Sequence, residues 1–391
     1  MLIKLKLRNF LSFKDASVTL GKLNIVVGAN ASGKTNLLKS LELLGSLARL
    51  GYPHVEGYAA PSAGGGWYLN LGGLAHNFDA GAGVVVGVDA LVEGAVVSYT
   101  VRISADSFEE EVARGREILM KASSKERSFT YAARDGSPRT VDRLAAASLD
   151  VLYYDLRGDK RIQRVNVYPS ALAHVPADAH PALRGLAELL RGVKVLHPDL
   201  AALRLRSSVR DQPETGYRGE GLARQLLQLC LERRKEYEVI EKTVRGLLPD
   251  LDAIVPRIEG EEVEIQMRIN GLPRPLTAAG IPDGALRLTC FTAALQSGCT
   301  LVAFEAPECF LHPRQLELLV ALAKLAEPQI IFTTYSPQLL DFFRPEEVVV
   351  VSRVDAASKA ERLVESEKYK IVREFLEAGG SLSEAWLTGL F

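Results

Sequence analysis

Eight consecutive residues near the amino terminus constrain this chain more than any other stretch. Gly28-Ala29-Asn30-Ala31-Ser32-Gly33-Lys34-Thr35 matches the pattern G-x-x-x-x-G-K-[ST] at every fixed position. The run Leu23–Val27 before it predicts a short buried strand, and the leucines after it follow the spacing of one helix face. An accidental glycine-rich turn is the alternative, but it explains neither the lysine and threonine nor the two flanking elements. The stretch therefore predicts a phosphate-binding loop and a bound nucleoside triphosphate.

The residue types of this loop indicate how a nucleotide would be held. Glycines let the backbone curl until successive N–H groups point into one concavity that suits phosphate oxygens. The Lys34 ammonium would reach the β- and γ-phosphates, and the Thr35 hydroxyl would be a ligand of Mg²⁺. ATP and Mg²⁺ are the expected cofactors. The candidate nucleotide-binding residues here are Gly28, Asn30, Ala31, Ser32, Gly33, Lys34, Thr35 and Asn36.

Composition and charge argue against several other classes of protein. The 391 residues are 47% hydrophobic and 24% charged, which is typical of a globular protein. A net charge of −1 gives no overall attraction to nucleic acid, so any DNA contact would come from a local patch. The first residues lack the apolar core of a signal peptide, no apolar run reaches the length of a membrane span, and the four cysteines show no C-x-x-C spacing. We therefore expect a cytoplasmic protein with no membrane partner.

The order of expected elements favours an α/β fold in three parts. Residues 1–140 begin with strands that lead into the phosphate loop and continue with a strand hairpin. Residues 141–250 are expected to form a mainly helical insertion. Residues 251–391 contain apolar strands that alternate with helices, a pattern that indicates a mostly parallel sheet covered on both faces.

The middle of the chain is where the patterns are weakest. Residues 108–121 fit either a strand or a helix, and residues 143–156 have helix-like patterning. Gly221 to Leu248 predicts a pair of amphipathic helices, and Ile254 to Ile269 alternates like two strands. Two groups of basic residues could contact DNA phosphates, although solvated loop charge is the favoured interpretation. These groups are Arg157, Lys160, Arg161 and Arg164, then Arg204, Arg206 and Arg210.

An acidic residue that would complete the nucleotide site lies far along the chain. Leu301–Glu305 is a fully apolar strand that ends in a carboxylate. An apolar run that ends in glutamate is common by itself, but here Pro307-Glu308 and Leu311-His312-Pro313 follow it. Paired with the phosphate loop, Glu305 is expected to hold Mg²⁺ opposite Thr35.

With these motifs the chain resembles the ABC-type ATPase heads of the RecF/SMC-like class. The likeness is to bacterial predicted AAA-family ATPases related to the ATPase part of OLD-family proteins. It rests on Gly28–Thr35, Asp283–Arg287, Phe304–Pro313 and Thr333–Asp341. The resemblance implies a P-loop NTPase fold, an ABC-ATPase head with a mixed sheet and a helical/β middle insertion. It also implies that Asp283-Gly284 is the signature loop, which completes the nucleotide site of a second subunit, so that a homodimer sandwiches ATP.

Two positions depart from the pattern of that family, and both concern hydrolysis. The family has a glutamate that polarises the attacking water where this chain has Ala306, and a switch histidine where it has Tyr335. A methyl group accepts no proton, and a phenol with a pKa near 10 is a poor replacement for imidazole. Glu305, Ala306 and Tyr335 are thus the catalytic positions. Either the enzyme is naturally slow, or Ala306 was introduced by engineering. Glu308 is a weak substitute carboxylate, and Asn77 a weak candidate for the glutamine of the Q-loop.

Two functions fit this reading. The first is an ATP-dependent dimerising head with weak hydrolysis that acts in DNA maintenance or anti-phage defence. The second is an ATP-regulated scaffold or sensor that hydrolyses little and controls a partner effector such as a nuclease. The changes at Ala306 and Tyr335 favour the second.

Overall fold

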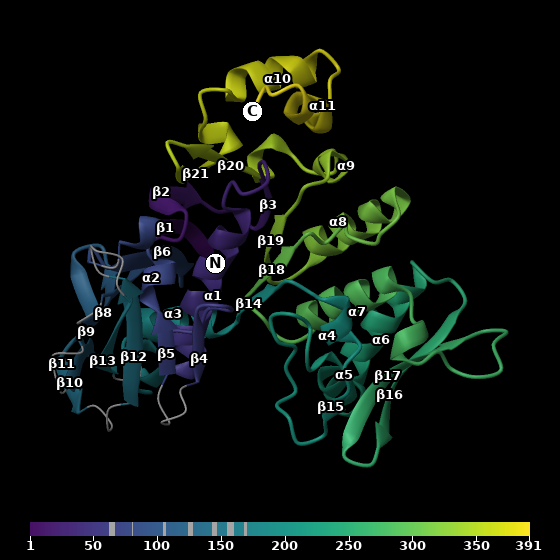
Figure 1. Cartoon of the computed structure of the whole chain (residues 1–391), viewed down its shortest axis with the longest axis horizontal. Coiled ribbons are helices and arrows are strands. Elements are labelled where there is room, and N and C mark those ends of the chain that lie inside the picture. Colours follow the sequence, from purple (N-terminus) through teal and green to yellow (C-terminus); the bar gives the residue numbers. More distant parts are fainter. Residues whose placement is uncertain are drawn as a thin grey trace.

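The phosphate loop lies where a β-rich lobe meets a central sheet. The computed structural model describes residues 1–61, 67–79, 81–104, 107–123, 128–142, 147–154, 160–167 and 170–391. Figure 1 shows the β-rich lobe at lower left, a helical lobe at lower right, and a carboxy-terminal segment above the central strands.

The central sheet has six strands in the order β14-β18-β19-β3-β20-β21. Neighbouring strands are parallel except β21, which is antiparallel to β20. Every residue of β3, β18 and β19 is buried, as expected of parallel strands covered on both faces. The prediction of a mostly parallel, doubly covered sheet is confirmed. The strands are β14 (Val193–Leu196), β18 (Leu301–Glu305), β19 (Gln329–Thr333), β3 (Leu23–Val27), β20 (Val348–Val354) and β21 (Ala357–Arg362).

The two faces of this sheet pack into different cores. Because side chains alternate along a strand, Val26 belongs to one hydrophobic cluster whereas Ile25 and Val27 belong to the other. The first cluster includes α1 (Lys34–Leu50) and the β-rich lobe. The second includes the helical lobe and the carboxy-terminal segment. The helix that follows the phosphate loop is therefore held against the β-rich side.

An eight-stranded antiparallel sheet forms most of the β-rich lobe, in the order β11-β10-β9-β8-β7-β6-β1-β2. The predicted hairpin is confirmed as β6 and β7, and the ambiguous residues 108–121 are strands. The strands are β1 (Leu2–Phe10), β2 (Phe13–Thr19), β6 (Val84–Val92), β7 (Ala95–Ile103), β8 (Phe108–Arg114), β9 (Glu117–Ser123), β10 (Ser128–Ala132) and β11 (Pro138–Asp142).

A smaller four-stranded sheet corrects one expectation. Ala147–Tyr154, within the stretch expected to be helical, is strand β12, which pairs with β13 (Lys160–Val167) and with β5 (Trp67–Asn70). The helix prediction was wrong for residues 147–154, where Leu149, Val151 and Tyr153 recur with period two, and the rest of the stretch 143–156 lies outside the described residues. Strand β4 (Ala59–Pro61) completes this sheet.

The helical lobe contains the predicted amphipathic pair. Helices α5 (Leu222–Glu232) and α6 (Arg234–Arg245) confirm it, and they pack with α7 (Asp283–Leu295) in one hydrophobic cluster. The expected strands at 254–269 are also confirmed, as an antiparallel pair. The lobe further contains α4 (Leu200–Leu203), β15 (Ser207–Ser208), β16 (Leu251–Glu259) and β17 (Glu262–Ile269).

The remaining helices connect or cover the strands. They are α2 (Leu71–Leu74), α3 (Pro181–Arg191), α8 (Leu316–Leu325), α9 (Pro337–Leu340), α10 (Tyr369–Glu377) and α11 (Leu382–Leu387). Within the described residues, no helix combines the length and apolar character needed to cross a membrane. Between residues 141 and 250, β12, β13 and α3 lie with the β-rich lobe, whereas α4 to α6 lie in the helical lobe. The three domain boundaries stay a prediction.

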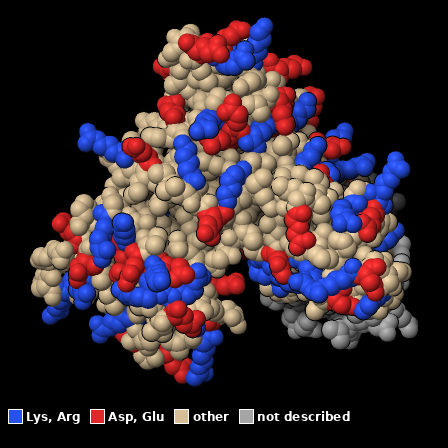
Figure 2. All heavy atoms as spheres, turned by 180° about the vertical axis from the view of Figure 1, so that it is seen from behind, with Lys and Arg blue, Asp and Glu red and all other residues tan. Residues whose placement is uncertain are grey.

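Charged side chains of both signs alternate over the surface seen in Figure 2. In the second basic group, Arg204 pairs with Asp283, Arg206 with Glu259, Glu262 and Glu264, and Arg210 with Glu261. These pairs fit the favoured interpretation of solvated, locally balanced charge. In the first basic group, Arg157 lies outside the described residues, and only the backbone of Lys160, Arg161 and Arg164, in β13, is described.

Candidate nucleotide-binding site

The phosphate loop turns tightly between β3 and α1, and two of its glycines are required by their surroundings. Gly28 has a φ of 155°, and a Cβ there would lie 2.0 Å from the Val351 carbonyl oxygen. Gly33 has a φ of 115°, and a Cβ there would lie 2.5 Å from the Ser358 hydroxyl. Side chains are thus excluded at both positions. Helix α1 begins at Lys34, so its first N–H groups, which lack partners within the helix, face the end of this loop.

Two elements outside the motif brace the loop. The Ser358 hydroxyl lies 2.5 Å from the Ser32 carbonyl oxygen and 2.7 Å from the Ser12 hydroxyl. Asn36 Nδ2 donates to the same Ser12 hydroxyl at 2.8 Å. The turn between β1 and β2 and the hairpin of β20 and β21 therefore position the loop. Sequence reasoning missed both serines, since nothing local marks them.

The Lys34 amine is buried among groups of the loop and the two acids. Its Nζ donates to the carbonyl oxygens of Gly28 at 2.7 Å and Ala29 at 3.0 Å, and lies 3.8 Å from the centre of the Tyr335 ring. Burial lowers the pKa of Lys34 to about 8, while the nearby carboxylates of Glu305 and Glu308 act in the opposite direction. The amine is thus held inside the loop, where phosphate oxygens would meet it.

Glu305 is brought to the phosphate loop across 270 residues of sequence. Thr35 Oγ1 donates to Glu305 Oε1 at 2.5 Å, and His197 Nδ1 lies 2.7 Å from Oε2. Burial by itself would raise the pKa of Glu305, but the hydrogen bonds from His197 and Thr35 outweigh it and lower the pKa. The carboxylate is therefore ionised at neutral pH, the form in which it binds a hard cation such as Mg²⁺.

His197 is the side chain that sequence reasoning missed at this site. It follows the last residue of β14, which is the strand next to β18, and carboxyl ends of parallel strands meet at one edge of the sheet. Its ring stacks on Tyr217 with centroids 6.0 Å apart. The spacing of His197 from the other histidines matches no set of metal ligands, so no local pattern in the sequence marks it. Asn77, the weak Q-loop candidate, instead lies next to His76, whose Nδ1 contacts the Leu11 carbonyl oxygen.

The chain reverses direction sharply after Glu305. Ala306 has a φ of 47°, and its carbonyl oxygen accepts a hydrogen bond from Arg287 Nη2 at 2.8 Å. The same guanidinium donates to the carbonyl oxygens of Glu305 and Pro198. Arg287 thereby ties α7 to the end of β18. Tyr335 follows β19 and lies over Lys34, and burial with the two neighbouring glutamates raises its pKa.

The structure brings some predicted site residues together and leaves others apart. The loop residues, Glu305, Ala306 and Tyr335 meet at one edge of the central sheet. Asp283 and Gly284 begin α7 in the helical lobe (Figure 1). Asp283 pairs with Arg204 at 2.5 Å, and a Cβ at Gly284 would lie 2.6 Å from the Phe310 carbonyl oxygen. Neither has a hydrogen bond or ion pair to the phosphate loop of its own chain among the described residues.

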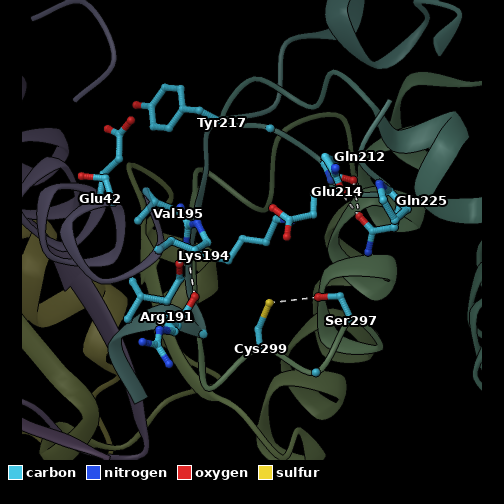
Figure 3. A pocket seen from close by; sticks show the side chains of 18 of the residues that line it. Glu42, Arg191, Lys194, Val195, Gln212, Glu214, Tyr217, Gln225, Ser297 and Cys299 are labelled. Carbon is cyan, nitrogen blue, oxygen red and sulfur yellow. Dashed lines mark hydrogen bonds between the residues drawn. The ribbon is translucent and has the colours of Figure 1, made fainter. Parts of the chain in front are cut away.

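A cavity of about 750 Å³ is lined in part by Tyr217, whose ring stacks on His197. Figure 3 shows Glu42 of α1 beside Tyr217, and Lys194 of β14 near Glu214. Burial lowers the pKa of Lys194. Residues of α1, β14 and α5 line this cavity, so it lies between the two lobes. Tyr217 therefore both lines the cavity and stacks on His197.

Comparison with known proteins agrees with this geometry. Residues 23–341 match the family described as "AAA domain, putative AbiEii toxin, Type IV TA system". No curated protein matches the sequence significantly. Two solved structures share the fold: the SmcHead bound to the C-winged helix domain of ScpA, and the Pyrococcus furiosus Smc head domain with an extended coiled coil bound to the C-terminal domain of ScpA.

Each of these two structures is 14% identical to this chain with a TM-score of 0.50. The matches cover 92% and 96% of this chain, and 97% and 99% of the respective Smc chains. At this identity the likeness concerns the fold alone, and it confirms the predicted P-loop NTPase head. The chain belongs to the AAA-domain family described for residues 23–341, and it has the fold of an ABC/SMC-like P-loop ATPase head.

Proposed function

We propose that this chain is an ATP-binding head that dimerises on ATP and hydrolyses it slowly. One observation carries the proposal: the Thr35 hydroxyl of the phosphate loop bonds the Glu305 carboxylate directly beside the buried Lys34 amine. A hydroxyl, a carboxylate and a loop of N–H groups are the donor set of a Mg-nucleotide site.

Residues of the loop would bind the phosphates, and Thr35 and Glu305 would hold the cation. Backbone N–H groups from Gly28 to Thr35 and the Lys34 ammonium would contact phosphate oxygens. Thr35 and Glu305 suit Mg²⁺, because both offer hard oxygen atoms and the pKa of Glu305 is lowered. Bound Mg²⁺ would neutralise charge on the β- and γ-phosphates. His197 would orient Glu305 through its hydrogen bond to Oε2.

The dimer is proposed from residues that do not reach their own nucleotide site. Asp283 and Gly284 begin α7, away from the phosphate loop of the same chain. The resemblance to ABC-type heads implies that these two residues would contact ATP bound by a second copy of the chain. ATP would then bind the dimer better than the monomer, and linkage requires it to promote dimerisation.

Slow hydrolysis is proposed from the groups at the edge of β18 and β19. Ala306 offers no proton acceptor, and the pKa of Tyr335 is raised further above neutrality. The same observation favours the second candidate, an ATP-regulated scaffold or sensor that controls an effector such as a nuclease. The family description, which names a toxin, is compatible with an effector-linked or defence role.

A role in DNA maintenance has less support than a scaffold role, and we propose a cytoplasmic location. The paired arginines at 204, 206 and 210 offer little free positive charge for DNA. Four cysteines without disulfide bonds fit a reducing compartment.

Single-turnover ATP hydrolysis with and without DNA, alongside calorimetric titration with Mg-ATP, tests this function. We expect binding, slow turnover and little effect of DNA. Failure to bind Mg-ATP would overturn the proposed function, whereas binding with turnover at the rate of ordinary ATPases would overturn only its slow-hydrolysis part. Strong stimulation by DNA would move the protein toward the DNA-maintenance reading.

A further inference from the structure

We infer that Glu308 is the carboxylate that takes the proton from the attacking water, in place of the acid missing at Ala306. The inference rests on the proposed ATPase function and deepens it by naming a catalytic residue. Glu308 was only a weak candidate in the sequence, because it lies two positions beyond the expected one. The turn of the backbone after β18 nevertheless brings its side chain to the end of β19.

The turn after β18 carries Glu308 back toward the nucleotide site. Ala306 has a left-handed φ of 47°, and the Cys309 N–H donates to the Ala306 carbonyl oxygen at 3.2 Å. Pro307 is buried inside this turn. The Glu308 side chain consequently reaches the end of β19, where Oε1 accepts hydrogen bonds from Thr334 Oγ1 at 2.6 Å and from the Tyr335 N–H at 3.3 Å.

Thr334 fixes this carboxylate relative to the phosphate loop. It is fully buried, and its N–H donates to the carbonyl oxygen of Val26 at 3.0 Å. Val26 belongs to β3, the strand that ends in the phosphate loop. One hydrogen-bonded path therefore joins Glu308 to the strand that would position the nucleotide.

The second oxygen of Glu308 is buried but has no hydrogen-bond partner among the described residues. A buried acceptor without a partner is costly, and such groups in native proteins call for an explanation. Glu305 differs, because Thr35 and His197 engage both of its oxygens. Both carboxylates lie close enough to Lys34 to act on the charge of its amine. One acid is thus fully engaged, and the other keeps an unpartnered oxygen on a side chain that contacts Tyr335, whose ring lies over the Lys34 amine.

A free carboxylate oxygen at this place can complete the hydrolysis step. The water oxygen attacks the γ-phosphorus while one water proton passes to Glu308 Oε2. The bond between the γ-phosphorus and the β–γ bridging oxygen breaks, and its electron pair leaves with ADP. The proton then passes from Glu308 to the phosphate product, which regenerates the carboxylate. The sum is ATP and water giving ADP and phosphate.

A purely structural role for Glu308 makes a different prediction. Its Oε1 could serve only to hold the turn at residues 334–336, in which the Ser336 N–H also donates to Thr334 Oγ1. Glu308→Gln keeps an acceptor oxygen for Thr334 and the Tyr335 N–H, so a structural role survives this change. Proton acceptance does not survive it, because an amide is not a base at neutral pH.

The test measures single-turnover hydrolysis and Mg-ATP affinity of the full chain, of Glu308→Gln, and of the control Glu317→Gln. Glu317 is an exposed residue of α8, so its change leaves both quantities unaltered. We expect Glu308→Gln to lower the rate roughly 10²-fold or more while ATP affinity stays within about twofold. Adding Ala306→Glu to Glu308→Gln should restore turnover.

The results separate a failure of the inference about Glu308 from a failure of the proposed ATPase function. If Glu308→Gln turns over at the unaltered rate, or if it loses ATP affinity as well, Glu308 is not the base and the inference falls while ATP binding stands. If the unaltered chain binds ATP but shows no turnover that Glu308→Gln can lower, the inference also falls. If the unaltered chain does not bind ATP, the proposed function itself falls.

Discussion

The two sides of the candidate site differ in how closely they keep the pattern of ABC-type heads. On the binding side, every fixed position of the phosphate loop is present, and Glu305 bonds Thr35. On the hydrolysis side, Ala306 and Tyr335 stand where an acid and a histidine are expected. This difference is the basis of the proposal that the chain holds ATP and hydrolyses it slowly.

The strongest way to break this comparison is to disable the binding side. Lys34→Ala should lower ATP affinity at least roughly 10²-fold, because charge-assisted hydrogen bonds contribute about 1.5–3 kcal/mol each. Titration calorimetry measures the affinity. Lys22→Ala is the matched control, since Lys22 contacts the Glu327 carbonyl oxygen at the opposite end of β3. Equal affinity in Lys34→Ala and the unaltered chain would remove the phosphate-loop assignment.

Restoring an acid on the hydrolysis side should sharpen the comparison. Ala306→Glu is expected to raise the single-turnover rate roughly 10²-fold, the usual contribution of a general base. Ala306→Gln has nearly the same size but no base, so it serves as the control and should give no gain. An unchanged rate in Ala306→Glu would mean that Tyr335 limits the reaction, that position 306 does not face the γ-phosphate, or that Glu308 already supplies the full effect of a base.

The pH dependence of binding tests the buried amine. Because the pKa of Lys34 is about 8, its charge is nearly complete at pH 7 and largely lost at pH 9. ATP affinity should therefore be nearly full at pH 7 and below, and fall roughly tenfold between pH 7 and pH 9. Lys34→Arg stays charged throughout, so its affinity should not change over this range. A flat profile for the unaltered chain would show that Lys34 keeps its charge.

The smallest expected change is a doubling of mass. If binding is intact and hydrolysis slow, ordinary Mg-ATP should produce a lasting dimer, which sedimentation or light scattering can follow. Asp283→Ala should weaken the dimer and leave ATP affinity of the monomer unaltered, because Asp283 is partly exposed and pairs with Arg204 rather than with the phosphate loop of its own chain. A mass that does not respond to ATP would argue against the nucleotide sandwich.

Local sequence determined the parts of this protein whose contacts are close along the chain. The phosphate loop is one continuous stretch between a strand and a helix, so its residues identify it without any partner. The apolar strands Leu23–Val27 and Leu301–Glu305 predicted a buried parallel sheet for the same reason. The helix pair α5 and α6 followed from its period. Where the period was misread, at 147–154, the prediction was wrong.

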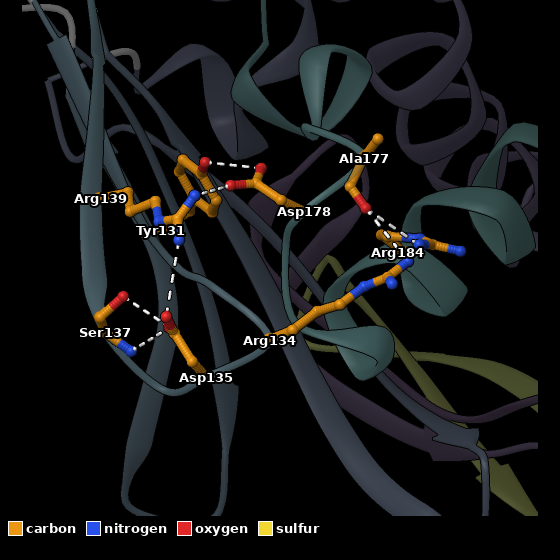
Figure 4. Close-up of polar contacts among 8 residues, drawn as sticks. All are labelled: Tyr131, Arg134, Asp135, Ser137, Arg139, Ala177, Asp178 and Arg184. Atoms are coloured by element: carbon orange, nitrogen blue, oxygen red, sulfur yellow. Dashed lines mark hydrogen bonds and ion pairs between the residues drawn. The ribbon is translucent and has the colours of Figure 1, made fainter.

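Only the tertiary structure decided which distant residues meet. Figure 4 shows Asp178 accepting hydrogen bonds from Tyr131 and Arg139, which attaches the hairpin of β10 and β11 to the segment before α3. No local pattern marks such a contact, and the same holds for Ser358 beside the phosphate loop.

The site itself divides in the same way. Eight adjacent residues identify the phosphate loop. His197 meets Glu305, and Glu308 meets Thr334, only because of the order of the strands and the left-handed turn at Ala306. Spacing along the sequence carries no information about these contacts, because they depend on which strand ends lie side by side. The sequence thus determined that a nucleotide site exists, and the fold decided which side chains surround it.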